Sequence, residues 1–261
     1  METNIAEALL RGITRQLAAD FIAPAPDADL GSLIGGLRAI NARASSWMKA
    51  GLAAAFPDIG WGAEESRADG IESGAKWIYD PIDGAYHFVQ GLPLWSASLA
   101  LVVDGKTEAA FVYEPALDEM FVAKRSGGAS CNGQALHTSG KTTLPTSVFA
   151  TAVPPARSVS APLSKLALRS LQIVSDNCFV VRQLGAASLQ LAYVAAGRLD
   201  GYWEVGDDVN DWLAGALIVQ EAGGAVTDFA GHAFGPQANG IVAGPEVLRQ
   251  RLQDFVHTAG D

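Results

Sequence analysis

Short β-type runs alternate with apolar helical runs through the second half of this chain. The predicted strands cover residues 148–152, 178–182, 202–204, 225–227 and 241–243. The predicted helices cover residues 162–173, 186–196, 211–221 and 245–256. This alternation is typical of layered α/β domains, in which helices pack on the faces of a sheet. The pattern therefore indicates a layered α/β architecture.

The first half begins with helices and continues with strands. Apolar residues at helical spacing predict helices over residues 4–22 and 30–56, and a Gly35–Gly36 pair is expected to break or bend the second. Short β runs follow at residues 76–79, 96–103, 107–113 and 120–123, with a hairpin signal at Asp104–Gly105. A soft boundary near residues 142–147 divides one compact unit into halves of residues 1–145 and 146–261.

Composition excludes several classes of protein. The chain has 261 residues, about half of them apolar, which is ample for a large core. Its net charge of −10 and the absence of a Lys/Arg cluster argue against a nucleic-acid partner. No apolar stretch approaches the roughly 18 residues of a membrane span. Cys131 and Cys178 form no CxxC motif, and the start of the chain shows no signal-peptide pattern, so a reducing, cytoplasmic location is expected.

The segment from Trp77 to Ala85 carries the clearest chemical signal. A β run leads to Asp80, Pro81 keeps the chain extended, and Asp83–Gly84 forms a turn. Two carboxylates at the end of a strand can converge on one Mg²⁺ ion, which prefers oxygen ligands. A helix that begins after Asp83 would direct free backbone N–H groups at an anion. Taken alone, the segment is equally compatible with an ordinary Asp-capped turn.

Two more acidic segments are uninformative when each is taken alone. Glu64–Glu65 follows a short predicted strand, and an isolated acidic pair is usually a solvated surface feature. Asp211 stands at the start of a strongly apolar helix, where it is expected to serve as an N-cap.

Together and in this order, the three segments resemble the inositol monophosphatase family. That family carries a GEE-type segment, then DPIDGT, then a distal WD-x-A-A-G helix. Connecting segments match as well, and the resemblance extends over residues 56–244. It implies an αβαβα sandwich with an active site between the two halves.

The resemblance also implies a set of site residues. Two or more Mg²⁺ ions are expected: the first on Glu64, Asp80 and the backbone carbonyl of Ile82, and the second on Asp80, Asp83 and Asp211. Glu64, Asp80 and Asp83 are the expected catalytic residues. The expected substrate contacts are the backbone N–H groups of Gly84 and Ala85, the loop at Gly185 and Ala186, and the carboxylate of Glu204.

The function implied is Mg²⁺-dependent hydrolysis of a small polyol or sugar phosphate by a cytoplasmic homodimer. Four positions depart from the family pattern, among them Asn210, which replaces the Trp of the distal motif. Ala85 replaces a Thr that helps activate the attacking water, His87 replaces an Asn, and Asn41 falls where an Asp supports a third metal ion. His87 is either a packing residue or a substitute base or phosphate contact. The alternative function is that of a catalytically impaired metal- or phosphate-binding protein with a regulatory or scaffold role.

Overall fold

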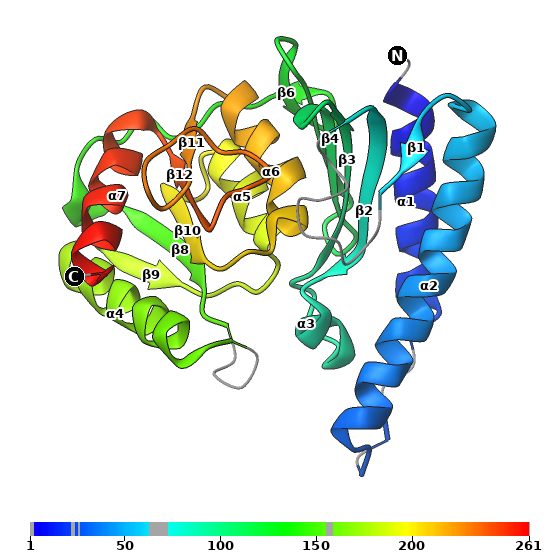
Figure 1. The fold of residues 1–261 in the computed structure, drawn as a ribbon, viewed down its shortest axis with the longest axis horizontal. Coiled ribbons are helices and arrows are strands. Elements are labelled where there is room, and N and C mark those ends of the chain that lie inside the picture. Colours follow the sequence, from blue (N-terminus) through cyan, green and yellow to red (C-terminus); the bar gives the residue numbers. More distant parts are fainter. Residues whose placement is uncertain (1–2, 22–23, 26, 63–72, 155–158, 261) are drawn as a thin grey trace.

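The computed structural model describes residues 3–21, 24–25, 27–62, 73–154 and 159–260, and within these ranges the elements stack in five layers (Figure 1). The layers follow the order helix, sheet, helix, sheet, helix. This arrangement confirms the αβαβα sandwich. Glu64 and Glu65 lie outside the described residues.

The first outer layer and the first sheet are built from the N-terminal part of the chain. The outer helices are α1 (Thr3–Ala19) and α2 (Leu30–Ala55). The sheet has the spatial order β1 (Gly60–Trp61), β2 (Ala75–Asp83), β3 (Ser96–Val103), β4 (Lys106–Glu114), β5 (Glu119–Lys124), β6 (Gly128–Cys131) and β7 (Gln134–Ala135). β1 pairs with β2 in parallel, and the following pairs are antiparallel. A short helix, α3 (Ala85–Val89), links β2 to β3.

The second sheet and its helices come from the C-terminal part of the chain. The sheet has the order β11 (Ala225–Thr227), β12 (Gly240–Gly244), β10 (Gly201–Val205), β8 (Val148–Ala152) and β9 (Val180–Arg182). Its outer face is covered by α4 (Ala161–Asn177) and α7 (Glu246–Gly260), and α5 (Ala187–Ala195) and α6 (Val209–Glu221) lie between the two sheets (Figure 1).

Both faces of the first sheet are apolar because each is covered by helices. Leu99 and Phe111 belong to the buried cluster under α1 and α2, whereas Ala100 and Val112 belong to the cluster around α5 and α6. Successive side chains of a strand point to opposite faces, so strands covered on both sides form continuous apolar runs.

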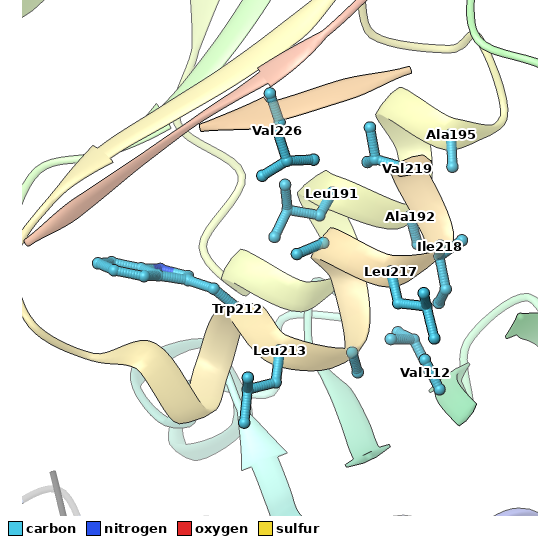
Figure 2. Packing of buried hydrophobic residues seen from close by; sticks show 14 of the residues in the cluster. Val112, Leu191, Ala192, Ala195, Trp212, Leu213, Leu217, Ile218, Val219 and Val226 are labelled. Atoms are coloured by element: carbon cyan, nitrogen blue, oxygen red, sulfur yellow. The ribbon is translucent and has the colours of Figure 1, made fainter. Parts of the chain in front are cut away.

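The central helices are buried around nearly their whole circumference. Figure 2 shows Leu191 of α5 and Leu217 of α6 between Val112 of β4 and Val226 of β11. A helix that is apolar on all sides belongs in the interior of a layered fold. This burial explains why the segments that became α5 and α6 lack a polar stripe.

Three predicted element boundaries were wrong. α2 is continuous from Leu30 to Ala55, so the Gly35–Gly36 pair does not break it. α6 begins at Val209 with Asp208 as its N-cap residue, so Asp211 lies in the first turn and is not the cap. β2 continues to Asp83 instead of ending at Tyr79, because its pairing with β3 resumes after an irregularity.

The hairpin predicted between β3 and β4 is confirmed. Asp104 and Gly105 have φ values of 47° and 76°, and two positive φ values define the type I′ turn that matches strand twist. Asn132–Gly133 makes a similar turn between β6 and β7, two short strands that the sequence did not predict. In the described part of the chain, no helix has the length and apolar character needed to cross a membrane.

The contact between α5 and α6 gives a test of the central layer. A Cβ atom at Gly215 of α6 would lie 2.5 Å from Cβ of Leu191. Gly215→Ala is therefore expected to lower the free energy of unfolding by about 1–3 kcal/mol, although Ala favours helix. Gly12 of α1 is the matched control, because a Cβ added there would have no described atom within 4 Å. Gly12→Ala should raise stability by about 0.5–1 kcal/mol. If urea unfolding shows that Gly215→Ala and Gly12→Ala change the free energy of unfolding in the same direction, this packing is contradicted.

Candidate metal centre

A bulge in β2 brings Asp80 and Asp83 to the same side of their sheet. Residues three apart in a regular strand point to opposite faces. Here Asp80 pairs with Ser98 and Asp83 with Ser96, so β2 has one more residue than β3 in this interval. The backbone N–H of Ile82 donates to Oδ1 of Asp80 at 3.0 Å. The extra residue shifts the alternation and lets both carboxylates converge.

Gly84 turns the chain sharply after Asp83. Its φ of 88° lies in the left-handed region, and an added Cβ would lie 3.1 Å from the Leu94 carbonyl oxygen and 3.2 Å from Cβ of Ala186. Only glycine fits both the conformation and the space. α3 begins at the next residue, Ala85, so the turn places the first amides of this helix beside the two carboxylates.

Asp83 caps a helix from the other half of the molecule. Its Oδ1 accepts a hydrogen bond from the Ala187 backbone N–H at 3.1 Å. Its Oδ2 accepts from the backbone N–H and the hydroxyl of Ser188, both at 2.6 Å. The N-cap residue of α5, Ala186, has no side-chain oxygen to do this. The carboxylate of Asp83 therefore holds the start of α5 against the end of β2.

Asp211 completes a cluster of three carboxylates. It extends from the first turn of α6, and one carboxylate oxygen from each of Asp80, Asp83 and Asp211 lies within 4.8 Å of the others. Asp83 is buried, and the other two are partly exposed. The structure thus brings together three of the four acidic residues predicted as metal ligands, and the fourth, Glu64, lies outside the described residues.

Burial and mutual repulsion make this cluster costly without a cation. Burial raises the pKa of Asp83 to about 6, although hydrogen bonds from Ser188 and Ala187 oppose the change. Burial, together with the negative charges of Asp80 and Asp83, raises the pKa of Asp211 well above its ordinary value. A hard divalent cation would relieve both effects, and an all-oxygen donor set suits such an ion. The residues present therefore fit a metal site.

Glu204 lies near the end of β10, close enough to the acidic cluster to interact with it electrostatically. Its Oε2 accepts hydrogen bonds from the Tyr202 hydroxyl at 2.5 Å and from Nε1 of Trp212 at 2.7 Å. Burial raises the pKa of Glu204 to about 7, and the charges of Asp208 and Asp83 act in the same direction. Glu204 is thus held as an acceptor beside the three aspartates.

The loop predicted to line the pocket packs on the turn after β2. Ala186 contacts Gly84, as described above, and Gly185 has a φ of 91°. A side chain at Gly185 would overlap the ring of His87. His87 therefore covers this loop, which favours its interpretation as a packing residue. Asn41 lies within α2.

Sequence reasoning missed three contributors to this site. The first is Ser188, whose hydroxyl donates to Asp83. The same hydroxyl oxygen lies 3.0 Å from that of Ser96 in the buried interior. Strand alternation could have placed Tyr202 on the same face as Glu204. No local pattern indicated that Trp212 or Ser188 would reach across to residues of other elements.

Removing the charge of Asp83 and removing that of Asp211 should change the stability of the protein in opposite directions. In metal-free protein, Asp83→Asn is expected to lower the free energy of unfolding by about 2–3 kcal/mol, because its amide group opposes the N–H donors of α5. Asp211→Asn should leave stability unchanged or raise it, because it removes one charge from the cluster. Urea unfolding in the presence of a chelator measures both. An Asp83→Asn protein as stable as wild type would rule out the capping role.

Stability of the metal-free protein should fall as the pH rises. The raised pKa values of about 6 for Asp83 and about 7 for Glu204 mean that the folded chain binds more protons than the unfolded chain, whose carboxyls titrate near 3.8 and 4.5. The free energy of unfolding is therefore expected to decrease by a few kcal/mol between about pH 4 and pH 7. Unfolding curves across this range should show a smaller decrease with Mg²⁺ present. A stability that rises over the same range would contradict the expectation.

Comparison with known proteins agrees with this geometry. The model of the inositol monophosphatase family matches residues 36–259. The Nus factor SuhB of Pasteurella multocida is 40% identical over 199 residues, which cover 76% of this chain and 73% of that protein. The inositol-1-monophosphatase of Mesorhizobium japonicum is 39% identical over 202 residues, covering 77% and 75%.

Solved structures share the fold over nearly their whole length. The extragenic suppressor protein suhB from Bartonella henselae gives a TM-score of 0.82 at 32% identity and covers 98% of both chains. The IMPase of Thermotoga maritima gives a TM-score of 0.81 at 28% identity, covering 98% of this chain and 96% of its own. Because the family model spans most of the sequence and these relatives match about three-quarters of it, this chain belongs to the inositol monophosphatase family.

Proposed function

We propose that this protein hydrolyses the phosphate monoester of a small polyol or sugar with the help of Mg²⁺. The observation that carries the proposal is the convergence of Asp80, Asp83 and Asp211 beside the turn at Gly84. These carboxylates come from both halves of the chain and share one partly exposed site. Family membership and the inositol-1-monophosphatase relative support the same reaction.

Two or more Mg²⁺ ions are proposed for the site. Asp80, Asp83 and Asp211 would hold one ion, and Glu64, Asp80 and the Ile82 carbonyl would hold another. When bound, these ions would polarise a phosphate oxygen and lower the pKa of a water molecule. The aspartates would fix the ions relative to the amides of the Gly84 turn, which fits an anionic group between them.

The chain's own groups would then bind and orient the ester. The backbone N–H of Ala85 would donate to a phosphate oxygen, since the first amides of a helix have no partner within the helix. The N–H of Gly84, which also acts on the Asp83 carboxylate, would donate to a second phosphate oxygen. Gly185 and Ala186 would form the adjoining wall. Glu204 would accept a hydrogen bond from a hydroxyl of the polyol. In this arrangement the phosphate would lie at α3 and the alcohol at β10.

Ala85 limits what the chain can do for the attacking water. A methyl group neither donates nor accepts a hydrogen bond, so residue 85 itself cannot supply the hydroxyl found at this position in the family pattern. Help from a positioned acid or base is typically worth about 10² to 10⁴ in rate. We therefore propose a slower phosphatase in which Glu64 alone orients the water.

Phosphate release from polyol, sugar and nucleotide monophosphates tests this function. Wild type should release phosphate only with Mg²⁺, and Asp211→Asn should abolish release while the protein stays folded. Ala85→Thr should raise the rate at least about tenfold, because the hydroxyl restores orientation of the water. Asp211→Asn is preferable to Asp83→Asn here, because Asp83 also caps α5. Release that continues without divalent ions would contradict the metal mechanism.

A regulatory or scaffold role is the second candidate. Ala85 favours it, and relatives named Nus factor SuhB, from Pasteurella multocida and Escherichia coli, are 40% and 37% identical to this chain. In that case wild type would bind Mg²⁺ and phosphate esters without turnover, and Ala85→Thr would restore activity. If neither wild type nor Ala85→Thr releases phosphate from any ester when saturated with Mg²⁺, the phosphatase proposal is rejected. Homodimer formation and a cytoplasmic location also stay predictions.

A further inference from the structure

Two side chains fix a single oxygen of Glu204. The Tyr202 hydroxyl and the Trp212 indole N–H both donate to Oε2, at 2.5 Å and 2.7 Å. They come from different elements, since Tyr202 lies on β10 and Trp212 in the first turns of α6. The carboxylate is therefore held from two directions, and Oε1 takes part in neither bond.

Glu204 is the partly exposed member of this network. Tyr202 and Trp212 are both 0% exposed, whereas Glu204 is partly exposed. Figure 2 shows Trp212 extending from α6 toward the strands of the second sheet, away from the α6 residues that pack on the first sheet. Solvent therefore reaches Glu204 but not the two buried side chains that donate to it.

The negative charges around Glu204 favour a neutral group as its binding partner. Negative charges of Asp83 and Asp208 act on Glu204, and Glu204 in turn acts on Asp211. A second anionic group on a substrate would meet repulsion at this position. A neutral hydroxyl can donate to Oε1, and a carboxylate whose other oxygen is fixed by two donors favours a single direction of approach.

We propose that Tyr202 and Trp212 are positioning residues that direct Oε1 of Glu204 at a neutral hydroxyl of the substrate. This inference rests on the proposed function, because it assumes that the ester's phosphate lies at the metal centre. It deepens that function by specifying the chemical group recognised next to the phosphate.

The chain offers a matched control for Trp212. Trp203 is the next residue of β10 after Tyr202, is 1% exposed, and points to the opposite face of the strand. Its Nε1 donates to the Ser170 hydroxyl at 3.0 Å, within the cluster under α4 and α7. Trp203→Phe and Trp212→Phe therefore each remove one buried indole donor, but only the second removes a donor to Glu204.

The experiment compares two esters in the presence of Mg²⁺: a cyclic polyol monophosphate such as inositol monophosphate, and 4-nitrophenyl phosphate, which has no alcohol hydroxyl. Trp212→Phe and Tyr202→Phe should each raise KM for the polyol ester about tenfold with little change in kcat, because an unfixed carboxylate accepts less well. KM for the aryl ester should not change. Trp203→Phe should leave both values as in wild type.

The outcomes separate the inference from the proposed function. If wild type hydrolyses both esters and Trp212→Phe and Tyr202→Phe affect them equally or not at all, the positioning role is wrong although the phosphatase stands. If wild type hydrolyses neither ester, the proposed function fails. Calorimetric binding of the same two esters to the Mg²⁺-loaded protein then decides the inference. Weaker binding of only the polyol ester by Trp212→Phe would support it, and equal binding would overturn it.

Discussion

The hydrogen bonds from α5 to Asp83 connect the candidate site to the packing of the two halves. Asp83 ends a strand of the first sheet, and α5 lies between the sheets, so the carboxylate bridges two layers. A helix whose own N-cap residue is Ala186 leaves its first amides without a local acceptor. The buried carboxylate supplies that acceptor. Any change in the charge or position of Asp83 therefore affects both the metal centre and the contact between the halves.

The clustering of the three aspartates makes their ionisation unfavourable, and a bound cation can offset this free-energy cost. Three aspartates share one site, and burial together with their mutual repulsion makes full ionisation unfavourable. Hydrogen bonds from Ser188 and Ala187 stabilise Asp83 only in part. Binding of such an ion would therefore be linked to folding stability, since an ion that binds the folded chain stabilises it by mass action. The site is thus built to be most stable when occupied.

Close packing of the central layer allows this site to form. Gly215 lets α6 approach α5, and Gly84 lets the β2 turn approach Ala186. Both contacts involve the elements that connect Asp83 to Asp211: the turn after β2, the start of α5, and α6. Larger residues at either glycine would separate the elements that carry the carboxylates. The geometry of the cluster therefore depends on small residues whose roles are steric.

The sequence by itself determined the layered α/β class, most of the helices and strands, and the identity of the acidic residues. These features follow from local periodicity and from motifs at fixed spacing. The hairpin at Asp104–Gly105 and the candidate ligands Asp80 and Asp83 belong to this group. Tertiary structure decided the bulge that places Asp80 and Asp83 on one side, the capping of α5 by Asp83, and the hold of Trp212 on Glu204. These depend on contacts between residues far apart in the chain, and neither periodicity nor spacing specifies which distant groups will meet.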